Sequence, residues 1–434
     1  MTSIHEFDAD AKKKFMDILS VQLPPFDRFV SKSELVEWEI GVESRKEYLN
    51  KLSKDLKQHQ GSLLVPVIGD VGSGKTHFLW QIKNSFNIEQ FASFIDLPRS
   101  KGKFDYNIYS DLIEEFGADR LRDFTQEFGE KFGAGERLYG FFRTQNITKV
   151  TLNAYEQLNK SFTNTSALQQ CIMVLIQHFI KRDTYDITER WLLGQQLDLD
   201  ELFMISVNND LSTNDISKIM LKLLIDHYKQ GIILLFDDFD EAIQEYKTLS
   251  NYFDDEDVNW AKDLGSGKDE YKGSQAKTEE FDTLEGIILD KLKRIDNFKL
   301  VVVMDNQNAD PILNWFRERI DSGKILDPIV LKPFTLRDTI SIYLIRMKNF
   351  CQKYNVTHPS IEFEIKDRSN FEELKYKYGA DLFYPLSYEI IEDVYMKYKG
   401  NVRKIVRTFK KIIDSIIFEE LKIDEINTRY QLFI

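Results

Sequence analysis

The chain has 434 residues, of which 42% are hydrophobic and 30% charged, and this balance is typical of a globular protein with a sizeable core. The net charge of −13 argues against a broadly basic nucleic-acid-binding protein, although it is compatible with a local basic face. Two distant cysteines, no C-x-x-C motif and six scattered histidines predict no zinc site and a reducing compartment. Because no stretch approaches the roughly 18 apolar residues of a membrane span and the first residues lack a signal-peptide core, we expect a cytoplasmic protein without a membrane partner.

Residues 1–60 are predicted to be an N-terminal segment that leads into the first strand. Its prolines favour an extended conformation at Leu23–Val30. A turn at Ile40–Glu43 precedes a helical pattern of apolar residues that runs from Tyr48 to Leu56.

A glycine-rich stretch with the pattern G-x-x-x-x-G-K-T follows the apolar run Leu63–Ile68 and consists of Gly69, Asp70, Val71, Gly72, Ser73, Gly74, Lys75 and Thr76. A helix-compatible run beginning at His77 comes next, so the stretch has the strand–loop–helix context of a phosphate-binding loop. The glycines let successive amides face the phosphates, and the helix directs its positive end at them. We predict that Lys75 reaches the β- and γ-phosphates and that the hydroxyl of Thr76 binds Mg²⁺. Pro66 lacks an amide hydrogen, so regular strand pairing is expected to start only at Val67.

A long helical insertion is predicted between the second strand, Phe91–Pro98, and the next one. It covers residues 103–228 approximately, with clear helices at Ala167–Ile180 and from Ser212 or Thr213 to Tyr228. Two strand crossovers would need far fewer residues than this interval contains. The insertion is either a structural elaboration or a surface for a partner or a substrate, and we slightly favour the functional surface.

Two carboxylates follow the apolar run Ile232–Phe236, which predicts a strand buried on both faces. The C-terminal ends of strands are where open α/β sheets bind their ligands. Asp237 is predicted to hold Mg²⁺ through water, and Asp238 is predicted to polarise an attacking water. An acidic turn is the alternative, but it fits poorly downstream of an intact phosphate-binding loop. A polar surface loop is then predicted at 249–282.

A helix at Leu284–Ile295 and a strand at Lys299–Met304 are predicted next. Asn306 follows that strand and either reaches the γ-phosphate and the attacking water or caps the next helix. The next helix, Asp310–Ile320, carries two further candidate residues, and the strand Ile325–Leu331 is predicted to close the sheet. The two candidates are Arg317 and Arg319.

From Thr335 the pattern is purely helical and predicts a lid domain at 335–434. One of its helices begins at Gly400-Asn401-Val402-Arg403. Lys399, Arg403 and Arg407 have the spacing i, i+4, i+8, so one helix face is basic. This face either follows the phosphates of a nucleic acid or is simply solvated.

Together these elements resemble the AAA+ ATPases, and within them the origin-recognition, replication-initiator-like branch. Gly69–Thr76 looks like Walker A, Ile233–Asp238 like Walker B and Asn306 like sensor 1. Gly400–Arg403 is similar to sensor 2, which implies that Arg403 touches the nucleotide bound to its own subunit. The resemblance also implies an α/β fold: a parallel sheet flanked by helices at 61–334, a C-terminal helical lid, and ATP and Mg²⁺ as ligands.

Two further features of that family have counterparts in this chain. Arg317 or Arg319 lies where the family places its arginine finger, which implies a homo-oligomer with nucleotides bridging its interfaces. Pro24–Val30 and Ile40–Glu43 occupy the place of the segment that lines the adenine pocket.

Three departures from the family pattern limit the functional prediction. Walker B ends in Asp-Asp, as in STAND-type NTPases, and the short side chain of Asp238 makes a water contact harder, so slow hydrolysis is expected. Because the predicted lid region of roughly 100 residues runs to residue 434, we expect no winged helix. The helical insertion is absent from the initiator pattern and looks more like ATPases of prokaryotic conflict and defence loci.

Three functions follow as hypotheses. The first is an oligomeric Mg-ATP-hydrolysing ATPase whose nucleotide state controls binding to DNA or RNA. The second is a STAND-like switch that gates a protein partner through the insertion. The third is a scaffold with a degenerate site, which the intact Lys75, Thr76 and Asp237 argue against.

Overall fold

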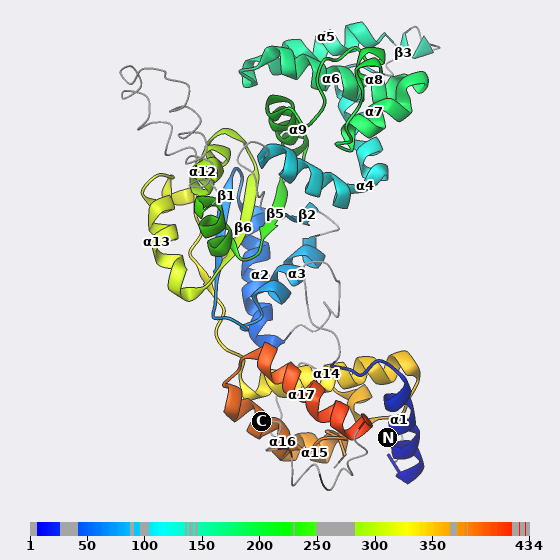
Figure 1. Ribbon diagram of the computed structural model, residues 1–434, viewed down its shortest axis with the longest axis vertical. Helices are drawn as coiled ribbons and strands as arrows, with labels where there is room; N and C mark the ends of the chain where they lie inside the picture. The colour runs from blue at the N-terminus through cyan, green and yellow to red at the C-terminus, as the bar shows by residue number, and fades with distance from the viewer. Residues whose placement is uncertain are drawn as a thin grey trace, which may run out of the picture.

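The computed structural model describes residues 7–26, 42–86, 91–95, 104–134, 137–138, 142–143, 146–228, 231–248, 283–364, 371–379, 381–418, 425 and 430. The polar loop expected at 249–282 and residues 27–41, which include most of the two expected adenine-pocket segments, lie outside this description. Within it the chain is an α/β structure around a five-stranded sheet. Figure 1 shows the sheet between a group of inserted helices and a second helical group that contains the first helix and the last helices of the chain.

The sheet is parallel and has the strand order β2-β5-β6-β1-β7. Because β6 lies between β1 and β5, the residues that follow these three strands emerge at one edge of the sheet, where open α/β sheets bind ligands. The order places the strand before Asn306, β6, next to the strand before the two carboxylates, β5. The strands are β1 (Leu63–Ile68), β2 (Phe91–Phe94), β5 (Ile232–Phe236), β6 (Phe298–Met304) and β7 (Ile329–Val330).

Pro66 does not delay the pairing of β1 with β6, so that prediction is wrong for this neighbour. The ladder runs along the whole of β1 and places Pro66 opposite Val302. The carbonyl oxygens of Leu64 and Ile68 accept hydrogen bonds from the β7 side of the sheet, so the missing amide of Pro66 faces that side too. There β1 forms a regular ladder only from Val67 onward, and the proline therefore interrupts no ladder bond.

Two layers of helices cover the sheet. Alternate side chains of the central strands enter two separate apolar clusters, one on each face. One face packs against α2 (Glu43–Gln58) and α3 (Lys75–Phe86), and the other against α12 (Leu284–Arg294) and α13 (Asn306–Arg317).

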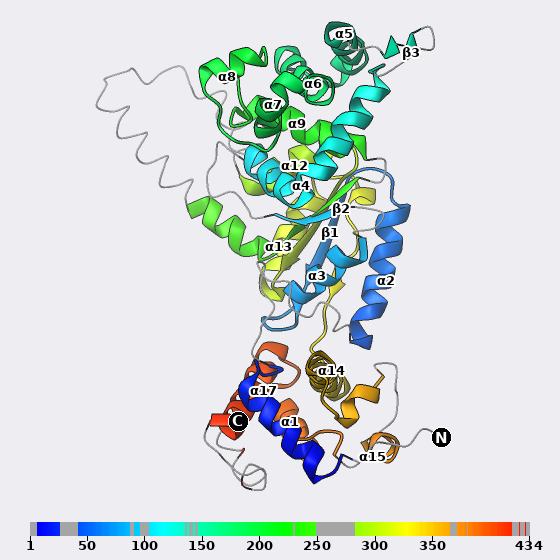
Figure 2. The same ribbon diagram turned by 90° about the vertical axis from the view of Figure 1, so that its right-hand side faces the viewer.

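The insertion is not wholly peripheral to the sheet. The first part of α4 (Phe104–Lys131) contacts β2, and α4 packs on α9 (Asn214–His227), so both helices join the same apolar cluster as the sheet. Gly117, at φ 77°, kinks α4. The remaining helices lie farther from the sheet in Figures 1 and 2. They are α5 (Ile147–Leu158), α6 (Thr165–Ile180), α7 (Tyr185–Leu192) and α8 (Leu199–Met204), together with a short hairpin of β3 (Arg137–Leu138) and β4 (Phe142–Arg143).

The lid consists of α14 (Leu336–Tyr354), α15 (Phe371–Tyr378), α16 (Tyr388–Tyr398) and α17 (Val402–Phe418). The N-terminal helix α1 (Ala9–Val21) packs into it, and Phe15 and Leu19 are fully buried in the lid's apolar cluster. Figure 2 shows α1 beside α17. Residues 1–60 are therefore not one segment, because α1 belongs to the lid while α2 covers the sheet.

Several element boundaries differ from those expected. The helix α13 begins at Asn306 and ends at Arg317, so Arg319 lies beyond it. The last strand has only two residues, and Ile325, where it was expected to begin, forms an isolated bridge with Leu64 instead. No helix among the described residues is long and apolar enough to cross a membrane.

The buried Lys299 on β6 allows a stability prediction. Its side chain is 1% exposed, its ammonium donates to the carbonyl oxygen of Leu56 at 2.7 Å, and burial lowers its pKa to about 8. The unfolded chain keeps the ordinary, higher pKa, so the charged lysine destabilises the fold below pH 8 and this penalty fades as the pH rises toward the unfolded value. Lys299→Met should raise the free energy of unfolding by about 2 kcal/mol at neutral pH, and this gain should vanish near pH ~10.

Urea unfolding of wild type and variant at the two pH values measures this difference. A gain that is equal at both would contradict the charge penalty.

Candidate functional site

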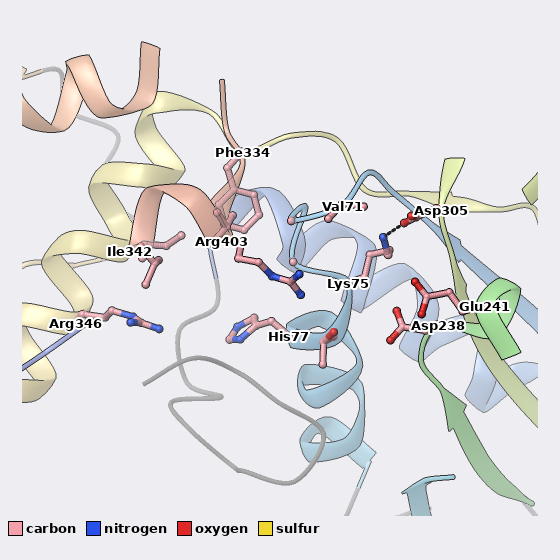
Figure 3. Close-up of a pocket in the computed structure, with 15 residues that line it drawn as sticks. Val71, Lys75, His77, Asp238, Glu241, Asp305, Phe334, Ile342, Arg346 and Arg403 are labelled. Carbon is pink, nitrogen blue, oxygen red and sulfur yellow. Dashed lines mark hydrogen bonds and ion pairs between the residues drawn. The ribbon is translucent and has the colours of Figure 1, made fainter. Parts of the chain in front are cut away.

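A cavity of about 380 Å³ lies between the sheet edge and the lid. Figure 3 shows its polar end, with Lys75 between carboxylates, and its more apolar end. There Phe334 approaches from residues 331–335 between β7 and α14, which we call the hinge, and Ile342 approaches from the lid. We call this cavity the loop–lid pocket. Its lining comprises Val71, Gly72, Gly74, Lys75, Thr76, His77, Asp238, Glu241, Asp305, Phe334, Ile342, Arg346, Val402, Arg403 and Val406.

Lys75 holds the inner side of the glycine-rich loop, residues 69–74. Its ammonium donates to the carbonyl oxygens of Gly69 at 2.7 Å and Asp70 at 3.3 Å, and it forms an ion pair with Asp305. The side-chain amide of Asn306 donates to the Asp70 carboxylate at 2.6 Å. The first two residues after β6 therefore contact Lys75 and the loop, and Asp305 is the one that lines the pocket.

The next part of the same loop is held by the first residues of the lid helix α17 and by Arg45 of α2. These contacts engage the carbonyl oxygens of the next three loop residues. A loop whose carbonyls are occupied in this way can direct its amides at an anion. The bonds run from Asn401 Nδ2 to Val71 O (2.9 Å), from the Val402 amide to Gly72 O (2.9 Å) and from Arg45 Nη2 to Ser73 O (3.0 Å).

Thr76 and Asp237 meet across the sheet edge. The threonine hydroxyl donates to Asp237 Oδ2 at 2.6 Å, and Asp237 is 5% exposed. A hydroxyl and a carboxylate in contact supply the oxygen ligands that Mg²⁺ prefers. The donor set therefore fits this cation.

Asp238 has a backbone conformation that is costly for a non-glycine residue, with φ at 51°. A strained backbone persists only where the surrounding structure imposes it, and such residues are often found at functional sites. Asp238, which carries this strain, also lines the loop–lid pocket.

Glu241 lines the pocket beside Asp238. The negative charge of Asp238 raises the pKa of Glu241, and burial and the nearby Asp240 and Asp305 add to the effect. Two carboxylates that share a pocket in this way can divide the tasks of accepting and holding a proton.

The lid side of the pocket is mainly apolar but carries two arginines. Phe334, Ile342, Val402 and Val406 form a wall, and Arg346 and Arg403 extend from the lid helices into the same cavity. Such a wall suits a planar ring, and the guanidinium groups suit phosphate.

The hinge that leads into this wall is tied to the sheet domain by Arg45. Its guanidinium donates to Lys332 O at 2.6 Å and lies 4.6 Å from the centre of the Phe334 ring. Burial lowers the pKa of Arg45.

The structure brings most of the predicted site residues together: Lys75, Thr76, His77, Asp238 and Arg403 line one cavity, and Asp237 contacts Thr76. Arg317 and Arg319 are not among the residues that line it. Arg317 is exposed at the end of α13, whereas Arg319 bonds to Glu318 and Trp315 and stacks on the Trp315 ring.

Sequence reasoning missed Asp305, Phe334 and Arg346. Asp305 had a usable signal, because it follows a buried strand as Asp237 does. Phe334 and Arg346 had none, since they reach the pocket only through the packing of the lid.

No protein-family model matches the chain, and no curated protein matches it. What the site does is therefore inferred from its own residues.

The close approach of Gly400 in the lid to the backbone of Phe334 allows a second prediction. Gly400 has φ 82°, and a Cβ atom there would lie 2.1 Å from the carbonyl oxygen of Phe334. Gly400→Ala should therefore lower the free energy of unfolding by about 2 kcal/mol or more, since both backbone strain and a backbone clash oppose it.

Gly323→Ala is the matched control, because a Cβ atom at Gly323 meets nothing within 4 Å. Thermal unfolding of both variants tests the fit, and equal melting temperatures would contradict it.

Proposed function

We propose that this chain is an AAA+-type ATPase that binds Mg-ATP in the loop–lid pocket and hydrolyses it slowly. The observation that carries the proposal is the contact between Thr76 and Asp237 at the end of a complete glycine-rich loop. It unites the two halves of a nucleotide site that lie far apart in the sequence. The strand order and the lid beside the loop add support.

The polar end of the pocket is suited to the phosphates. On binding, Lys75 exchanges its ion pair with Asp305 for contacts with the β- and γ-phosphates, and the loop amides donate to the phosphate oxygens. Thr76 and Asp237 would hold Mg²⁺, which when bound offsets the phosphate charge. Arg403 adds a second positive charge from the lid.

Hydrolysis requires a group that orients a water and accepts its proton. Asp238 is the proposed group, because it lines the pocket and its strained backbone holds it at the strand end. Glu241 shares this environment and is the nearest alternative. The short side chain of Asp238 is the reason to expect slow turnover.

The apolar end of the pocket is suited to the base. Phe334, Ile342 and Val406 provide a surface on which a purine ring can stack. Phe26 lies nearby in the lid, where it stacks on Tyr343 with ring centres 5.5 Å apart and has the Arg346 guanidinium 5.7 Å above it. Phe26 is fully buried and does not line the pocket, so the proposed role of the Pro24–Phe26 segment is to support Arg346 rather than to touch the base.

Assembly into a homo-oligomer is part of the proposal, with an arginine completing the neighbouring site. Of the two candidates we favour Arg317, because it is exposed whereas Arg319 is held against Trp315. Specific ATPase activity that falls on dilution would support assembly, and activity that stays flat would contradict it.

The partner controlled by ATP is proposed to be a nucleic acid. Lys404, Arg407 and Lys411 are exposed along α17, which starts at the pocket. Binding of labelled DNA or RNA that weakens steeply with salt would support this role. Salt-independent or absent binding would favour the alternative, a STAND-like switch that gates a protein partner through the insertion.

Lys75→Ala tests the nucleotide site. Removing this cation should weaken ATP binding by ~100-fold, because hydrogen bonds from an ammonium to phosphate are charge-assisted. Titration with a fluorescent ATP analogue measures the affinity, and circular dichroism checks the fold. An unchanged affinity would show that ATP does not bind here.

Asp238→Asn tests the catalytic assignment. The amide keeps the size of the side chain but cannot accept a proton, so ATP should bind normally while turnover falls ~100-fold or more. Glu241→Gln is the matched comparison and should retain more activity. If Glu241→Gln is the slower of the two, the proton acceptor is Glu241.

A further inference from the structure

The start of α17 lies directly on the glycine-rich loop. Asn401 makes two hydrogen bonds with one side chain: its Oδ1 accepts from the Lys404 amide at 3.1 Å, and its Nδ2 donates to Val71 O at 2.9 Å. The next residue, Val402, donates its amide to Gly72 O at 2.9 Å. The side chain that caps the helix therefore also binds the loop.

The loop is shaped to receive this side chain. A Cβ atom at Gly72 would lie 2.3 Å from Asn401 Oδ1, so a side chain at this position would exclude Asn401 from its place. Gly72 also has φ 83°. Gly72, the second glycine of the loop, is therefore needed both for the turn and for the space that Asn401 of the lid occupies.

The contact determines where the lid arginine lies. Arg403 is two residues after Asn401 in the first turn of α17, and it points toward the loop helix in Figure 3. Any rotation or withdrawal of the start of α17 moves Arg403 with it, because a helical turn is rigid.

We propose that Asn401 is a positioning residue that seats the lid on the glycine-rich loop and so holds Arg403 against the phosphates of the bound nucleotide. The role of Arg403 rests on the proposed function, whereas the contacts of Asn401 and Val402 with the loop do not depend on it. Asn401 touches neither phosphate nor water in this role. It acts through Arg403.

Two substitutions separate the hydrogen bond from Asn401 to the loop, which we call the seat, from the hydrogen bond by which Asn401 caps α17. Asn401→Ser keeps an oxygen that accepts the Lys404 amide, but its hydroxyl lies one bond closer to the backbone than Asn401 Nδ2 and is too short to replace the bond to Val71, whereas Asn401→Ala loses both contacts. The serine variant should therefore keep the melting temperature of the wild type more closely than the alanine variant. It should nevertheless release a fluorescent ATP analogue about 10-fold faster, the effect of one hydrogen bond.

A double-mutant cycle identifies the route of the effect. If Asn401 acts through Arg403, then Asn401→Ser combined with Arg403→Ala should release the analogue no faster than Arg403→Ala alone. Additive effects of the two substitutions would overturn the positioning role, and so would release from Asn401→Ser at the wild-type rate.

Hydrogen exchange of the nucleotide-free protein tests the seat independently of ATP. The Val402 amide should be protected in the wild type and exchange faster in Asn401→Ser. If the wild type binds no nucleotide but shows this difference, the proposed ATPase function fails while the seat stands. Equal exchange in the two proteins would overturn the seat itself.

Discussion

The glycine-rich loop is held from both sides, and the rest of the site depends on this constraint. Successive carbonyl oxygens from Gly69 to Ser73 accept hydrogen bonds, the first two from Lys75 and the others from the lid and Arg45. Sheet, hinge and lid therefore meet at one short segment of backbone. A ligand that reorganises this segment must change its contacts with the lid as well as with the sheet, which is how a small ligand could move a whole helical domain.

Carboxylates and Lys75 lie close together at the polar end of the pocket, where the phosphates and the cation are proposed to bind. Asp237, Asp238 and Asp305 come from adjacent strand ends, and Glu241 follows on the next helical turn. The raised pKa of Glu241 reflects the repulsion among these carboxylates. In the described structure Lys75 offsets part of this charge through Asp305. A divalent cation would relieve the repulsion further, so metal and phosphate should bind together.

Local patterns in the sequence were enough to predict the parts of the site that are continuous in the chain. The loop between Gly69 and Thr76 and the carboxylates after β5 each follow a buried apolar run, and both lie where expected. The features that sequence patterns did not predict depend on contacts between segments that are distant in the chain. Pattern reasoning could not show that α1 packs into the lid, that α4 covers the sheet or that Asp305 faces Lys75. Propensity carries no information about such partners.

The central claim is that a nucleotide occupies the pocket between loop and lid, and photolabelling tests it most directly. An ATP analogue with an azido group on the purine ring should label peptides that contain Phe334, Ile342 or Val406, because these residues form the apolar wall. Excess Mg-ATP should abolish the labelling. Labelling confined to other peptides, or labelling that ATP does not compete away, would contradict the claim.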